Sequence, residues 1–117
     1  MQETIKHINV NGTEYPIVFN LNVMEVIQEK YETLDKWGEL TDGKEREVDI
    51  KALKFGVTEM INEGIDIENE NMEVKREFLS EKQVGRIITN IGIEKLTTDV
   101  QQTVVDSTKT DDEPKNE

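Results

Sequence analysis

The chain has no cysteine and only one histidine, so it holds few of the side chains on which catalysis usually depends. A thiol nucleophile and a thiolate metal ligand are excluded, and His7 alone cannot be both general base and metal ligand. Carboxylates are abundant, but their spacing selects no catalytic pair. We therefore predict a protein that is not an enzyme, uses no cofactor or metal, and acts by binding.

Long apolar runs are also missing, and apolar residues make up only 34% of the 117 residues. No run approaches the length of a membrane span, so we expect no membrane partner. With no recognisable signal peptide, the simplest expectation is a cytoplasmic protein. Acidic residues outnumber basic ones by 26 to 14, giving a net charge of −12. This charge repels phosphates, and we expect no nucleic-acid partner.

The pair Asn11-Gly12 predicts a β-hairpin near the start of the chain, because both residues accept the positive φ of a type I′ turn. Folding about this turn places His7 opposite Pro16, and we expect His7 on the outer, solvated face. Period-two alternation places the apolar residues on the other face, namely Ile8, Val10, Tyr15, Ile17 and Phe19.

Two helices are predicted to follow the hairpin. Asn22 is the expected N-cap of the first, whose apolar stripe extends to Trp37. Asp49 is the expected N-cap of the second, whose buried stripe begins at Ile50. Gly64 stands where a glycine commonly ends a helix, so we expect the second helix to end there.

The remainder of the chain is predicted to hold an acidic linker and two more helices. The linker spans residues 66–77, and Ser80 with Gln83 forms a capping box after it. Gly92 is expected to end that helix, and a weaker one follows from Leu96 or Thr98 to Val105. The resulting fold is α+β, with an N-terminal hairpin packed on three to four short helices.

We expect one domain over residues 1–106 and a disordered acidic tail over residues 107–117, where polar and charged residues predominate.

Candidate partner-binding residues are large apolar side chains at the edges of the helical stripes. Phe55 lies off its stripe, so it is either an anchor for a partner or is covered by the hairpin or a terminal segment. Trp37 and Leu40 form a second candidate patch, for which burial in the core is the alternative. Tyr31 and Met24 widen the rim of the first stripe.

Four blocks of sequence carry a family resemblance. They are EYPIVFNLNVMEVIQEKYETLDKW (14–37), VDIKALKFGVTEMINEGIDIENE (48–70), LSEKQVGRIIT (79–89) and TVVDSTK (103–109). In these blocks, and in their order, the chain resembles the tail assembly chaperones of long-tailed phages and prophages of Gram-positive bacteria. The blocks are structural in character and assign no function to single residues.

The resemblance implies a non-enzymatic function in the host bacterial cytoplasm. Such proteins bind the tape measure protein, keep it soluble, and help the tail tube protein to polymerise around it. An extended form, made by ribosomal frameshifting, is implied as the contact with the tail tube protein. The resemblance also implies absence from the mature virion.

The alternative is an acidic decoy that mimics DNA and inhibits a host nuclease or regulator. Such a decoy needs carboxylates arrayed like phosphates along one surface. The acidic residues here are interspersed with lysines, which disfavours that alternative.

Overall fold

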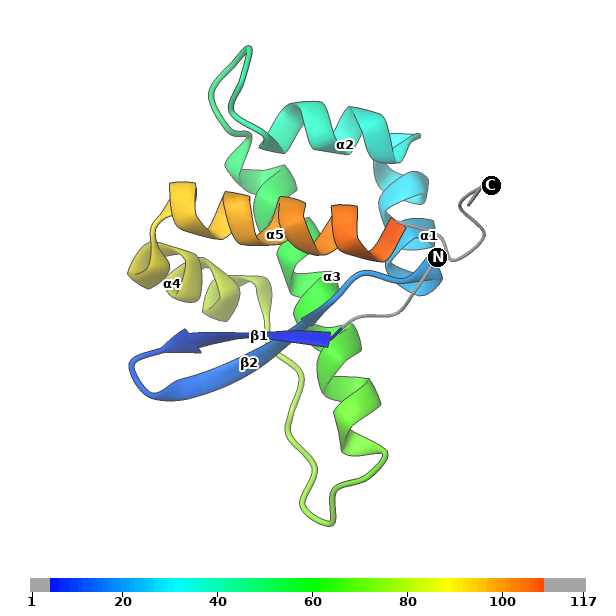
Figure 1. The fold of residues 1–117 in the computed structure, drawn as a ribbon, viewed down its shortest axis with the longest axis vertical. Coiled ribbons are helices and arrows are strands. Elements are labelled where there is room, and N and C mark those ends of the chain that lie inside the picture. The colour runs from blue at the N-terminus through cyan, green and yellow to red at the C-terminus, as the bar shows by residue number, and fades with distance from the viewer. Residues whose placement is uncertain (1–4, 109–117) are drawn as a thin grey trace, which may run out of the picture.

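The computed structural model describes residues 5–108, which form an antiparallel hairpin followed by five helices (Figure 1). In chain order the elements are β1 Ile5–Val10, β2 Thr13–Val18, α1 Leu21–Tyr31, α2 Leu34–Thr41, α3 Ile50–Asn69, α4 Glu81–Ile91 and α5 Ile93–Thr108. One hydrophobic core takes residues from every element. The predicted α+β architecture is confirmed. It holds five helices within the described residues rather than three or four, because the first predicted helix is divided in two.

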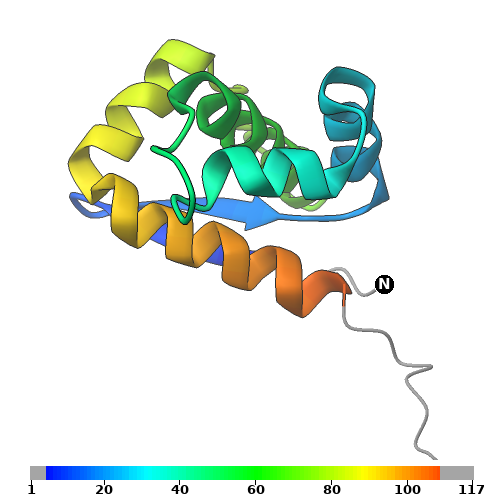
Figure 2. The same ribbon diagram turned by 90° about the horizontal axis from the view of Figure 1, so that it is seen from above.

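The hairpin has the predicted register but is covered on both faces. Ile8 pairs with Tyr15 and His7 with Pro16, about a turn in which Asn11 has a positive φ. Ile8 is buried on the predicted face, whereas Pro16, on the opposite face, is buried as well. In Figure 2 the strands lie between α5 on one side and α3 on the other. A helix therefore lies on each face of the two-stranded sheet.

His7 lies opposite Pro16 and is exposed, as predicted, although it stands on the face of the hairpin that α3 covers. Its Nε2 lies 2.7 Å from a carboxylate oxygen of Glu68 on α3. On the other face, the ammonium of Lys6 lies 2.5 Å from a carboxylate oxygen of Asp106 on α5. One polar contact thus connects each face of β1 to the helix that covers it.

Helix α3 runs along the long axis of the molecule and contacts β2, α1, α2 and α4 (Figure 1). The prediction that it ends at Gly64 is wrong, because the helix continues for five residues to Asn69. A Cβ on Gly64 would lie 2.8 Å from Cβ of Pro16. This glycine therefore allows β2 to approach the helix closely, and it does not act as a cap.

A second glycine of α3 allows Trp37 to lie against the helix backbone. A Cβ on Gly56 would lie 2.2 Å from Cζ2 of the indole ring, closer than any two such atoms approach. The indole Nε1 donates a hydrogen bond of 2.9 Å to the carbonyl oxygen of Ala52, one turn earlier. The ring is buried, and its one polar group is satisfied in the core.

The first helix begins two residues earlier than predicted, so the assignment of Asn22 as its N-cap is wrong. The side-chain oxygen of Asn20 accepts the backbone N–H of Val23 at 3.2 Å. Both asparagines are suitable capping residues. Asn22 lies inside α1, and its amide donates instead to Glu63 on α3.

The chain then turns sharply between α1 and α2. Glu32 has a φ of 76°, and its N–H closes the end of α1 by donating to the carbonyl of Gln28 at 2.8 Å. The hydroxyl of Thr33 accepts the N–H of Lys36 at 3.0 Å and caps α2. This break redirects Trp37 toward α3, which a continuous helix would not do.

The predicted linker at residues 66–77 begins too early, since α3 extends through its first part. After the helix, the side chain of Asn69 accepts from the N–H and donates to the carbonyl of Arg76, each at 3.0 Å. The guanidinium of Arg76 donates to the carbonyl of Glu14 at 3.0 Å and lies 4.9 Å from the centre of the Tyr15 ring. These contacts attach the loop to the hairpin.

The last two helices follow each other with one residue between them. The capping box of Ser80 and Gln83 is present, and Gly92 ends α4 with a φ of 99°. The carbonyl of Gly92 accepts the N–H of Leu96, so this residue also begins α5. Helix α5 extends through Thr108, two residues into the predicted tail, and residues 109–117 lie outside the described residues.

The close contact at Gly56 predicts opposite effects for two glycine-to-alanine substitutions. Gly56→Ala should lower the free energy of unfolding by about 1–3 kcal/mol, because the methyl group displaces the indole of Trp37. Gly38→Ala, on α2 with nothing within 4 Å of the new methyl, should raise it by up to about 1 kcal/mol through helix propensity. Urea unfolding monitored by tryptophan fluorescence measures both changes. Equal effects of the two substitutions would contradict the described contact.

Candidate partner-binding groove

Of the predicted binding residues, Tyr31 and Leu40 line a common hollow of about 380 Å³ between α1 and α2, and the other three do not line it. Trp37 is only 2% exposed and belongs to the core, which was the alternative considered for it. Met24 and Leu40 are partly buried and pack against the same core.

Phe55 is covered in part by α1. Its ring centre lies 5.9 Å from that of Tyr31 in an edge-to-face arrangement, and the ammonium of Lys30 lies 4.6 Å from its centre. Phe55 and Tyr31 are both partly buried and pack against the core.

The exposed apolar side chains lie elsewhere. Ile50, predicted on the buried stripe of its helix, is 46% exposed, and Ile93 is 40% exposed. The remaining large ones with high exposure are Leu21, Met72, Val74, Phe78 and Val105. Ile50 and Ile93 are the two that face a common hollow.

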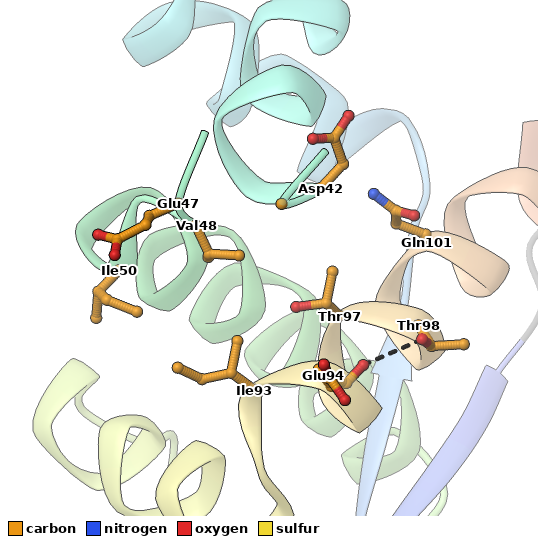
Figure 3. A pocket seen from close by; sticks show the side chains of 10 residues that line it. Asp42, Glu47, Val48, Ile50, Ile93, Glu94, Thr97, Thr98 and Gln101 are labelled. Atoms are coloured by element: carbon orange, nitrogen blue, oxygen red, sulfur yellow. Dashed lines mark hydrogen bonds between the residues drawn. The ribbon is translucent and has the colours of Figure 1, made fainter. Parts of the chain in front are cut away.

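This hollow is a groove of about 610 Å³ between the α2–α3 connection, the start of α3 and the first turns of α5 (Figure 3). Its apolar side chains are Val48, Ile50 and Ile93. A second hollow of about 360 Å³ shares Ile50 and Ile93 and extends along α4 to Ile88. The two hollows therefore adjoin at Ile50 and Ile93, and Lys54 of α3 also lines the second one.

The positions of the two isoleucines explain their exposure. Ile50 and Ile93 are the first residues of α3 and α5. Because helical side chains tilt toward the N-terminus, a side chain on the first residue projects beyond the end of the helix. The N–H of Asp49 donates to the carbonyl of Leu40 at 2.8 Å, which fixes the connection that forms the other wall.

The edges of the groove are acidic. Asp42, Glu47 and Glu94 line it, and none of the ion pairs among residues 5–108 involves these three carboxylates. The amide of Gln101 and the hydroxyl of Thr98 lie along the α5 side (Figure 3). An apolar centre between unpaired carboxylates suits an apolar group that carries positive charge beside it.

Thr97 lines the groove, but its hydroxyl group is buried beneath the surface. The residue is 8% exposed, and its Oγ1 has no hydrogen-bond partner among the described residues. The next threonine, Thr98, donates its hydroxyl to the carbonyl of Glu94 one turn earlier, at 3.0 Å. A buried hydroxyl without a partner is costly, so Thr97 lowers the stability of this part of the fold.

A smaller hollow of about 190 Å³ lies between α1 and the middle of α3, beside Phe78. The carboxylates of Glu59 and Glu63 line it. Burial raises the pKa of Glu59, and the carboxylates of Glu81 and Glu63 raise it further. This part of α3 therefore gathers negative charge around Glu59, while the amides of Asn20 and Asn22 donate to Glu63 at 2.8 and 3.0 Å.

Within residues 5–108, no three histidine, aspartate or glutamate side chains are placed to hold a metal ion. No family model matches the chain, and neither a curated protein nor a solved structure does. Among the helices of residues 5–108, none is both long and apolar enough to cross a membrane.

The burial of Phe55 predicts that its removal affects stability. Phe55→Ala should lower the free energy of unfolding by about 1–3 kcal/mol, because the ring loses its contacts with α1 and part of its burial. Phe78→Ala should change it by less than about 0.5 kcal/mol, because that ring is 58% exposed. Chemical unfolding of both variants tests the comparison, and a smaller loss at Phe55 than at Phe78 would contradict it.

The raised pKa of Glu59 predicts that replacing its carboxyl group with a neutral amide stabilises the fold, and that the size of this effect depends on pH. The folded protein binds this proton more tightly than the unfolded chain, so ionised Glu59 destabilises the fold above its folded-state pKa. Glu59→Gln should raise the free energy of unfolding at pH 8. The gain should shrink as the pH falls through that pKa toward the ordinary value of 4.5.

The matched control for this pH series is Glu25→Gln, which changes the net charge equally at an exposed position of α1. The measurement is urea unfolding of both variants and the parent between pH 8 and pH 5. An equal gain in the two variants would assign the effect to net charge and contradict the local explanation.

Proposed function

We propose that the protein is a non-enzymatic phage tail assembly chaperone that binds the tape measure protein and keeps it soluble. The observation that carries the proposal is the elongated apolar groove with unpaired carboxylates at its edges, on a chain of net charge −12. The sequence resemblance supports the same function independently of the groove.

The chemistry of such a client suits this surface. A long helical protein exposes apolar stripes until it is assembled, and a groove between helices accepts a stripe of that kind. The negative charge of the bound chaperone then disperses the complex by repulsion. A DNA mimic would need only an array of carboxylates, and an exposed apolar groove is not required for that function.

The finer parts of the proposal follow from the resemblance. The protein acts in the host bacterial cytoplasm during assembly and is absent from the mature virion. It assists polymerisation of the tail tube protein, with which an extended form makes contact. The groove replaces the predicted sites of partner contact at Trp37 and Phe55 in this proposal, because Trp37 is buried and Phe55 packs in part against Tyr31.

Co-expression with the tape measure protein of the same phage or prophage tests this function. The proposal predicts that the soluble fraction of the tape measure protein rises and that the two proteins co-purify. An unrelated acidic protein of similar size and charge is the matched control, since it separates binding from dispersal by charge alone. Unchanged aggregation, or an equal effect of the control protein, would contradict the proposal.

A further inference from the structure

We infer that the groove binds an amphipathic helix of a partner protein, whose apolar side chains are flanked by lysine or arginine. The inference deepens the proposed function by giving the chemistry of the bound segment. It rests on that function for the identity of the partner, but the chemistry of the groove can be tested without it.

The shape of the groove favours a helix over a small molecule. Its volume of about 610 Å³ falls within the range of about 300–1,000 Å³ that ligand pockets span, but it continues into the second hollow through Ile50 and Ile93. An elongated apolar surface between helix ends accommodates side chains that recur every three or four residues on one face of a helix.

The charge at the edges determines which helix is favoured. Asp42, Glu47 and Glu94 have no cationic partner among residues 5–108, so basic groups beside the apolar stripe would pair with them. A second copy of the chain would bring further negative charge to this acidic edge. Residues 109–117 contain four acidic and two basic side chains, so they are disfavoured for the same reason.

The probe is a synthetic amphipathic peptide with leucine at positions i, i+3, i+4 and i+7, and with lysine and glutamine at the flanking positions. Its matched control replaces every lysine by glutamate. Isothermal titration of the full chain should show binding of the lysine peptide that weakens as salt is raised, and no binding of the glutamate peptide. Equal binding of the two peptides would overturn the role of the acidic edge.

Variants of the chain locate the binding. Ile50→Ala combined with Ile93→Ala should weaken peptide binding at least about tenfold, because both side chains contact the bound stripe. Glu47→Lys should weaken it about fivefold at low salt. Glu25→Lys, on α1 and outside every described hollow, should leave the affinity unchanged. Equal losses for the two charge reversals would place the peptide elsewhere and overturn the inference.

Failure of this inference and failure of the proposed function have different signatures. If the isoleucine double variant still solubilises the tape measure protein, the groove is not the site, and the chaperone function stands. If the lysine peptide binds the groove but the tape measure protein stays aggregated, the inferred binding of a basic amphipathic helix is supported and the proposed chaperone function is contradicted. Sedimentation of the free chain gives a further outcome: a dimer abolished by Ile50→Ala with Ile93→Ala would place a second copy in the groove and overturn the inference.

Discussion

The fold depends on the close approach of two side chains to the backbone of α3. At Gly56 the indole of Trp37 lies where a Cβ would otherwise stand, and it donates a hydrogen bond to the helix carbonyl of Ala52. At Gly64, two turns later, the ring of Pro16 makes the equivalent approach from β2. These contacts position α2 on one part of α3 and the hairpin on another. The core can then be shared among short elements that each bury little apolar surface alone.

The groove follows from the same arrangement. Because Trp37 fixes α2 near the start of α3, the connection between the two helices forms one wall beside Ile50. Helix α5 crosses the other side of the hairpin and brings Ile93 and Thr97 to the facing wall (Figure 2). The two apolar side chains stay exposed because each is the first residue of its helix, which no preceding turn covers. The proposed binding surface is thus built from segments that the core already holds in place.

Sequence reasoning succeeded where the determining interactions are local. The turn at Asn11 fixed the register of the hairpin, and the capping box of Ser80 marked the start of α4. It failed where one residue type serves two purposes. The sequence around Gly64 is typical of a helix end, but the role of this glycine is a close contact with Pro16. Pro16 lies 48 positions earlier in the chain, so neighbouring residues could not predict the contact. The groove was missed for the same reason, since its walls come from segments that only the tertiary fold brings together. Phe55 packs in part against Tyr31 and Lys30 of α1, a contact between two helices that no local pattern could predict.

We propose that this acidic chain binds its partner through the groove between the starts of α3 and α5. The decisive measurement is amide hydrogen exchange of the full chain, alone and in complex with the tape measure protein. Binding in the groove should slow exchange at residues 47–51 and 93–98 and leave the α1–α2 turn around Glu32 unchanged. Slowed exchange confined to α1, or to the loop that carries Phe78, with none at the groove, would contradict it.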